Sequence, residues 1–71
     1  MRTIDLLGYH CPVPVNETKK ALELLPEGDI LEVIADDSEA KHDIPKLLDR
    51  VGARLVSLKE DAGEIRFYIE K

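Results

Sequence analysis

The stretch "YHCPVPVNETKKALELL", residues 9–25, holds the single cysteine of this chain and runs directly into a helix-like pattern. Apolar positions three and four residues apart predict an amphipathic helix with one buried stripe. The predicted stripe consists of Val15, Thr18 (through its methyl group), Leu22 and Leu25. Pro26 and Gly28 in "PEGD" predict the end of the helix, because both residues stop helix propagation. The thiol of Cys11 is therefore expected where a helix begins.

Two prolines shape the start of this helix. We expect Cys11 at the capping position and Pro12 at the first helical position, where a missing N–H is no loss. Pro14 then falls in the same turn. The positive end of the helix dipole faces the sulfur, and cysteines at such ends have pKa values lowered from about 8.5 to about 3.5–7.5. Because proline has no N–H, only Val13 offers the sulfur a nearby donor, so the anion is expected to be exposed and loosely held. His10 would add a positive charge when protonated.

Strands are predicted on both sides of this helix. Residues 2–7, "RTIDLL", alternate between apolar and polar side chains, as a strand with one buried face does. Residues 29–35, "DILEVIA", are almost continuously apolar and predict an interior strand buried on much of both faces. Residues 54–60 and 64–71 flank the turn "DAGE" and predict an antiparallel hairpin. The buried face of the last strand is expected to carry Ile65, Phe67 and Ile69.

A second amphipathic helix is predicted within residues 36–52, with Asp37 or Ser38 as its cap and a glycine at its end. Its apolar stripe consists of Ala40, Ile44, Leu47, Leu48 and Val51. Pro45 is awkward there, because proline removes one backbone hydrogen bond from a helix interior. Two alternatives stay open: a kinked helix, or a separate shorter helix capped by Asp43 with Pro45 in its first turn.

The predicted element order is β-α-β-α-β-β, and residues 1–71 form a single domain. The first two strands are joined through a helix, so a parallel pair with a right-handed crossover is expected. Two amphipathic helices and four strands are accommodated most simply in two layers. The predicted fold is therefore α+β, a two-layer α/β sandwich with two helices on one face of a mixed four-stranded sheet.

Composition excludes several classes of function. Of the 71 residues, 44% are hydrophobic and 35% are charged, and the net charge is −5. Nucleic-acid binding needs a basic stripe or an aromatic stacking platform, and this acidic chain with three aromatic residues has neither. No uncharged run approaches the roughly 18 residues of a membrane span, and Asp5 makes the N-terminus a poor signal peptide. These features favour a folded, cytoplasmic domain without nucleic-acid or membrane partners.

Alternative chemistries for Cys11 fit the sequence poorly. A lone cysteine is often a small buried hydrophobe, but neighbouring proline, glycine and His10 favour an exposed loop. A C-x-x-C redox pair would need a thiol where Pro14 stands. A structural zinc site needs four ligands, and Cys11, His10 and His42 are the only soft ones in the chain. A Cys–His hydrolase needs a base and an oxyanion hole within a pocket, for which a 71-residue domain has little room.

Other charged residues have ordinary structural interpretations. Asp36 and Asp37 resemble an acid pair or a cation site, but a helix cap with acids near the positive dipole end explains them more simply. His42 is expected as a solvated side chain rather than a base. Lys19 and Lys20 form the positive patch nearest the thiol. They suit an acidic partner, although a solvated helix face also accounts for them.

The motif "CPVP" resembles the C-P-x-P motif of the TusA/SirA-like sulfur-carrier family. The resemblance extends over nearly the whole chain through "LLGYHCPVP", "KKAL", "GDILEVIADD", "DIPKLLDRVG" and "FYIEK". It implies the two-layer β-α-β-α-β-β fold and a sulfur relay. Cys11 would accept sulfur as a persulfide from a cysteine desulfurase or rhodanese-like donor, in a loop shaped by Pro12 and Pro14. An acceptor protein of tRNA thiolation, molybdenum-cofactor assembly or sulfur oxidation would then receive it. Tyr9 and His10 stand where many members carry leucine and a variable residue, a departure that bears on partner specificity.

A single thiol suits such a carrier. Sulfur transfer is thiolate attack on sulfur and needs no general base when the attacking thiol is already ionised. A second cysteine would resolve the persulfide into a disulfide and discharge the sulfur. The expected protein is thus a sulfurtransferase-type carrier rather than a turnover enzyme, without metal or cofactor. Its expected docking residues are Tyr9, His10, Lys19 and Lys20. The alternatives are a non-enzymatic regulatory or binding module of the same fold and a thiol-redox sensor.

Overall fold

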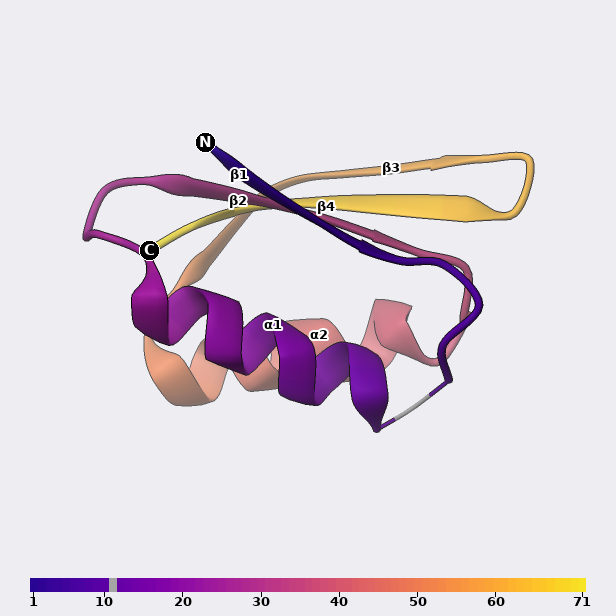
Figure 1. Ribbon diagram of the computed structural model, residues 1–71, viewed down its shortest axis with the longest axis horizontal. Coiled ribbons are helices and arrows are strands. Elements are labelled where there is room, and N and C mark those ends of the chain that lie inside the picture. The colour runs from indigo at the N-terminus through magenta and orange to yellow at the C-terminus, as the bar shows by residue number, and fades with distance from the viewer. Residues whose placement is uncertain (11) are drawn as a thin grey trace.

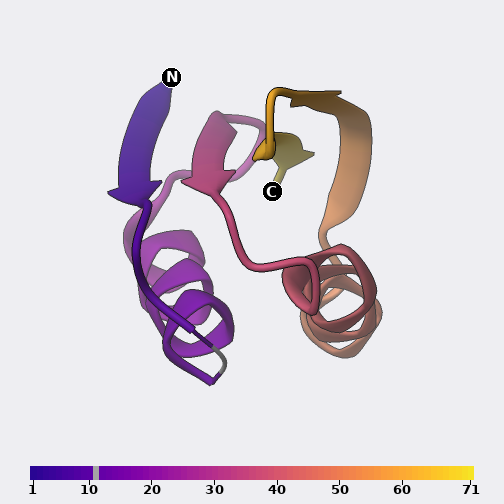
Figure 2. The same ribbon diagram turned by 90° about the vertical axis from the view of Figure 1, so that its right-hand side faces the viewer.

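A mixed four-stranded sheet forms one layer of the computed structural model, and two helices form the other (Figures 1 and 2). The structure describes residues 1–10 and 12–71. Its elements are β1 (Arg2–Leu6), α1 (Val13–Leu24), β2 (Ile30–Ala35), α2 (Ala40–Val51), β3 (Arg54–Asp61) and β4 (Glu64–Glu70). Both helices cover the same face of the sheet, with α1 beneath β1 and β2 in the end-on view (Figure 2). The predicted fold class and element order are confirmed.

The strands lie in the order β1-β2-β4-β3. β1 pairs in parallel with β2, and β4 pairs antiparallel with both β2 and β3. The hairpin partner β4 therefore lies inside the sheet, and β1 and β3 form its edges. Because β1 and β2 are parallel, their carboxyl ends lie at the same end of the sheet (Figure 1). Both helices also begin at that end, so the segment with the CPVP motif leaves the sheet beside the segment that leads into α2.

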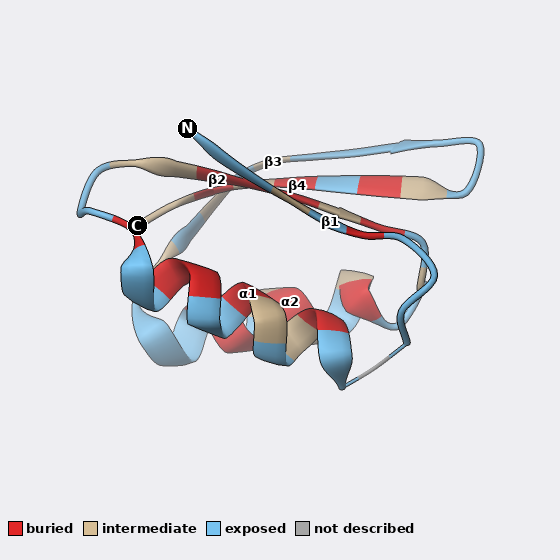
Figure 3. Ribbon diagram, in the orientation of Figure 1, coloured by how far each residue is buried: buried red, intermediate tan, exposed pale blue. Residues whose placement is uncertain are grey.

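The hydrophobic core lies between the sheet and the helices. β2 and β4 supply its upper side through Leu31, Val33, Ala35, Ile65, Phe67 and Ile69, each exposed by 2% or less. The helices bury the faces they turn toward the sheet and expose the others (Figure 3). The predicted burial of β2 on both faces holds only in part. Its second face has no helix over it, and Ile30 and Ile34 are there only half-buried.

α2 is one helix from Ala40 to Val51 with Pro45 inside it, so the alternative of a separate shorter helix capped by Asp43 is wrong. Of the two predicted caps, Asp37 fills the role: its carboxylate accepts the N–H of Glu39 at 3.0 Å, just before the helix. At the other end Gly52 is left-handed, with φ of 76°, a conformation that glycine adopts without steric cost.

A polar network crosses the open face of the sheet and centres on Glu32 of β2. This carboxylate is only 8% exposed although no helix covers it. It accepts hydrogen bonds from the hydroxyls of Thr3 on β1 and Tyr68 on β4, each at 2.9 Å, and pairs with Arg66 at 3.4 Å. The network thus joins three adjacent strands. The bond from Tyr68, followed by that from Thr3, lowers the pKa of Glu32 below its ordinary value, and Glu32 in turn raises the pKa of Tyr68.

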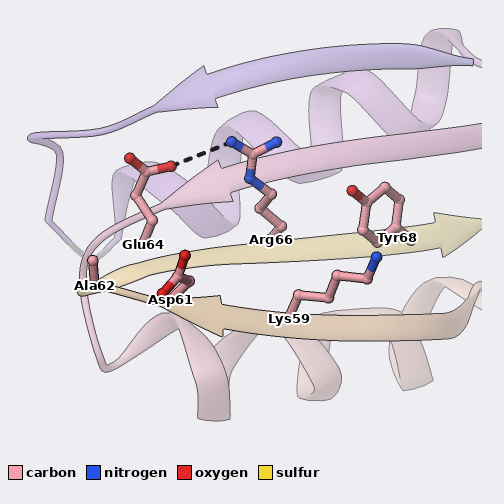
Figure 4. Close-up of a pocket in the computed structure, with 6 residues that line it drawn as sticks. All are labelled: Lys59, Asp61, Ala62, Glu64, Arg66 and Tyr68. Atoms are coloured by element: carbon pink, nitrogen blue, oxygen red, sulfur yellow. Dashed lines mark ion pairs between the residues drawn. The ribbon is translucent and has the colours of Figure 1, made fainter.

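A shallow pocket of about 440 Å³ adjoins this network near the β3–β4 turn (Figure 4). Arg66 pairs there with Glu64 at 3.5 Å, and the Lys59 ammonium lies 5.6 Å from the centre of the Tyr68 ring. Positive and negative side chains alternate around the pocket. The open face is therefore held together by cross-strand polar contacts in place of a second helical layer.

Acid should weaken the fold through Glu32. Its folded-state pKa lies below the ordinary value of 4.5, so the unfolded chain takes up the proton first as pH falls. The stabilising contribution of Glu32 is complete above pH 4.5 and is lost as pH falls through the folded pKa. Urea unfolding between pH 7 and 3 should show that Glu32→Gln is less stable than wild type at pH 7. The gap should narrow below pH 4.5, and a constant gap would contradict this account.

Candidate functional site

The loop after β1 is held by three backbone hydrogen bonds. The Leu7 N–H donates to the Asp5 carboxylate at 3.0 Å, and the Tyr9 N–H donates to the Leu6 carbonyl at 3.2 Å. The Gly8 N–H donates to both carboxylate oxygens of Asp36, each at 3.1 Å. Consecutive N–H groups on the way to the CPVP motif therefore have defined acceptors. One of these acceptors belongs to the segment after β2.

Asp36 and Asp37 do different work, and neither forms part of an acid pair. Asp36 accepts from Gly8, whereas Asp37 accepts from Glu39 ahead of α2. Among the residues that the structure describes, no group of three or more histidines, cysteines and acids is placed to hold a metal ion. The bond from Asp36 to Gly8 was missed by sequence reasoning. The available signals were a glycine shortly before the motif and an acid directly after a strand parallel to the one before the motif.

The start of α1 differs in detail from the prediction. The helix begins at Val13, and Pro12 is the residue that precedes it, one position later than expected. The Val13 N–H donates to the His10 carbonyl at 3.0 Å, and the Asn16 N–H donates to the Pro12 carbonyl at 3.0 Å. The expectation that Val13 offers its N–H to the sulfur is therefore wrong, because that donor is already used. Cys11 lies outside the described residues, so its exposure and its pKa stay predictions.

The two motif prolines occupy different environments. Pro12 is exposed, whereas Pro14 is fully buried against the core. Thr18, one turn further along α1, is also fully buried, and its hydroxyl donates to the Pro14 carbonyl at 2.7 Å. The predicted inward face of Thr18 is confirmed. Pro14 thus anchors the first turn of α1, and Pro12 lies on the surface.

Exposed apolar side chains surround the position of the motif. Tyr9 is 51% exposed, Leu7 38% and Val13 36%, and His10 is exposed beside them. An exposed tyrosine among exposed aliphatic side chains is the composition that protein-binding surfaces favour. Tyr9 and His10 are therefore accessible as expected.

Lys19 and Lys20 do not form one positive patch. Lys20 lies on the side of α1 toward β1 and pairs with Glu17 at 3.7 Å. Lys19 lies on the side toward Val51 at the end of α2. Consecutive helical residues point about 100° apart, and both lysines lie roughly 9 Å along the axis from Val13. The structure thus separates the two lysines from each other and from the start of α1. His42 is exposed, as expected.

A groove of about 510 Å³ instead lies beside the motif, between the start of α1 and the outer face of α2. Its lining consists of Pro12, Val15, Asp43, Lys46, Leu47, Asp49 and Arg50. Lys46 and Arg50 stand one turn apart on α2 and are the cations that the fold brings near the motif. Sequence reasoning missed them, because α2 follows the motif by some thirty residues and its approach to α1 is a tertiary feature.

The two prolines should differ in their effect on stability. Either proline-to-alanine change loosens the unfolded chain, at a cost of about 0.5–1 kcal/mol. Pro14→Ala also removes two buried methylenes, worth about 0.8 kcal/mol each. Urea unfolding should therefore show a loss of about 2–3 kcal/mol for Pro14→Ala and under about 1 kcal/mol for Pro12→Ala. Equal losses would mean that Pro14 does not anchor the helix.

The comparisons with known proteins agree with this geometry. Residues 2–71 match the sequence profile of the family described as "Sulfurtransferase TusA". The sulfur carrier protein TusA of Pseudomonas entomophila is 38% identical over 69 residues, which are 97% of this chain and 86% of that protein. TusA of Allochromatium vinosum is 34% identical over 68 residues, 96% of this chain and 90% of that protein.

The fold has a counterpart among solved structures. The crystal structure of a SirA-like protein from Desulfitobacterium hafniense superimposes with a TM-score of 0.87 at 37% identity, covering 99% of this chain and 96% of that one. No helix in the described part of the chain is long and apolar enough to cross a membrane. The match of profile, relatives and fold over almost the full length leads to one conclusion: this chain belongs to the TusA family of sulfurtransferases.

Proposed function

We propose that this sulfur-relay protein carries its sulfur as a persulfide on Cys11. The observation that carries the proposal is the position of the only cysteine, in the CPVP motif of a chain that matches the TusA family over residues 2–71. No other thiol is present to hold sulfur. The described residues on both sides support the role, because the loop before Cys11 and the first turn of α1 are each held by hydrogen bonds.

The chemistry is an exchange between sulfur atoms. The Cys11 thiolate attacks the terminal sulfur of a donor persulfide, forming a new S–S bond while the donor's S–S bond breaks. The donor leaves as a thiolate, and the proton of the terminal sulfur stays on the new persulfide. In the second step an acceptor nucleophile attacks that terminal sulfur, and Cys11 leaves as a thiolate. Neither step changes the total oxidation state of the sulfur atoms, so no cofactor is required.

Membership of the family gives this protein two kinds of partner, a sulfur donor and a sulfur acceptor. The donor in our proposal is a cysteine desulfurase or a rhodanese-like protein, because both hold sulfur as a cysteine persulfide. The acceptor belongs to tRNA thiolation, molybdenum-cofactor assembly or sulfur oxidation. The cytoplasm is the expected location, in keeping with a lone thiol that must stay reduced.

The donor docks over the exposed apolar surface around Tyr9, His10 and the start of α1. Two sulfur atoms must touch for transfer, so the donor has to cover the residues adjacent to Cys11. Tyr9 offers a rigid, half-exposed aromatic ring at this place. The groove beside Pro12, with Lys46 and Arg50 on its α2 side, continues the same surface and accepts the donor chain that flanks its persulfide.

Loading should be visible as a change in mass. Incubated with a cysteine desulfurase, its pyridoxal phosphate and free cysteine, the wild-type protein should gain one sulfur atom per chain. Peptide mapping should place the gain on Cys11, and a reducing thiol should remove it. Cys11→Ser should stay unloaded yet folded, because the serine hydroxyl can still cap a helix but cannot form a persulfide.

The serine variant also separates chemistry from binding. A Cys11→Ser protein that still supports sulfur relay in cells would contradict the carrier role and favour a binding module of the same fold. A wild-type protein that gains no sulfur from desulfurase or rhodanese-like donors, each shown to load a known carrier, would also contradict it.

Docking should depend on Tyr9 more than on equally exposed apolar residues elsewhere. Val56 on edge strand β3 is also 51% exposed and serves as the matched control. Tyr9→Ala should raise the half-saturating carrier concentration for desulfurase transfer about tenfold, the effect of losing an interface anchor worth about 1.4 kcal/mol. Val56→Ala should leave it unchanged. Chemical-shift changes with the donor that centred on the open face of the sheet would show that the docking surface is wrong.

A further inference from the structure

We propose that Asp36 is a positioning residue for the thiol: it fixes the loop before Cys11 against the end of β2 and thereby sets where the sulfur lies. The inference rests on the proposed role of Cys11 as the sulfur-bearing residue. It adds to that role a residue that lies 25 positions away in the sequence and outside the motif.

The contact has the geometry of a deliberate anchor. Both Asp36 oxygens lie 3.1 Å from the Gly8 nitrogen, so the N–H points between them. Gly8 has a φ of +84°, a left-handed conformation that glycine adopts easily and that other residues adopt at a cost. Hydrogen bonds to a carboxylate are roughly twice as strong as those between neutral groups. The chain thus turns at Gly8 and is held at that turn by a charged acceptor.

Asp36 differs from the other acceptors on this loop in where it comes from. Leu7 and Tyr9 donate to Asp5 and Leu6, which belong to β1, the strand that the loop has just left. These bonds shape the loop locally. Asp36 follows β2, the strand on which α1 packs from below. Its bond therefore relates the loop to the frame of the sheet and of the helix that follows Cys11.

This placement matters because sulfur exchange depends on alignment. The attacking sulfur must approach along the donor's S–S bond, and a displacement of about 1 Å can cost around a hundredfold in rate. Residues before Cys11 are fixed by Asp36, and residues after it by the bond from Val13 to His10 and the buried Pro14. Removing the Asp36 anchor frees one of the two sides.

The neighbouring aspartate provides a matched control. Asp36→Ala and Asp37→Ala each remove one carboxylate and one backbone acceptor from adjacent positions, but Asp37 holds the start of α2 and not the loop. Asp36→Asn keeps an acceptor oxygen and serves as the conservative rescue. In transfer from a cysteine desulfurase, Asp36→Ala should lower kcat about tenfold with the half-saturating carrier concentration within twofold of wild type. Asp37→Ala should keep the wild-type kcat, and Asp36→Asn should recover most of it.

Two measurements test the anchor without the relay. Amide exchange at Gly8 should accelerate at least tenfold in Asp36→Ala and stay near wild type in Asp37→Ala and Asp36→Asn. The pH midpoint for alkylation of Cys11 by iodoacetamide should rise in Asp36→Ala toward about 8.5, the value of a free cysteine. The rise would identify positioning, because loss of a nearby negative charge alone would lower that midpoint.

The outcomes separate this inference from the proposed function. If Asp36→Ala matches Asp37→Ala in alkylation and in Gly8 exchange, Asp36 is not a positioning residue, whatever the relay does. If wild type takes up no sulfur while the alkylation and exchange differences appear, Asp36 positions the thiol but the carrier role of Cys11 fails. A lower kcat shared equally by both alanine variants would also overturn the inference.

Discussion

The parallel pairing of β1 with β2 is the constraint on which the site depends. Leu6 lies opposite Ala35 at the last position of the ladder, so the chain leaves both strands at the same end of the sheet. The two segments that follow lead into α1 and α2, and Gly8 meets Asp36 across 28 positions of sequence. An antiparallel pair would have sent these segments to opposite ends. The start of both helices, the loop and its anchor would then have been separated.

The two faces of the sheet are stabilised by different interactions. The helix face is apolar and dry, with Phe67 and Leu31 fully buried. The open face depends on Glu32, whose carboxylate accepts from Thr3 and Tyr68 and pairs with Arg66. Both sets of contacts lie away from the loop that precedes α1. The exposed residues around the motif are thus free to serve a partner, because the stability of the fold is supplied elsewhere.

A sulfur carrier needs few chemical groups of its own. Exchange at sulfur requires a thiolate, an unobstructed approach and the absence of a second thiol, and it requires no base or enclosed pocket. The surroundings of the motif agree with these needs. Pro12, Tyr9 and Val13 are exposed, and the adjoining groove is an open surface feature rather than a cavity. Pro14 and Thr18 keep the helix in place beneath them. Specificity then belongs to docking, and reactivity to the position of one sulfur atom.

The sequence by itself determined the elements, their order and the motif. Alternation in β1, the stripes of α1 and α2 and the burial of Ile65, Phe67 and Ile69 are local periodicities, so they could be predicted without knowing any neighbour. Other features were decided only by the tertiary structure: the bond from Asp36 to Gly8, the approach of Lys46 and Arg50 to Pro12, and the separation of Lys19 from Lys20. Each depends on strand register or helix orientation, which bring distant residues together and leave no periodic trace. Even the Val13 N–H, close to the motif, found its acceptor in the turn at His10, because backbone geometry rather than residue type decides which donors remain available.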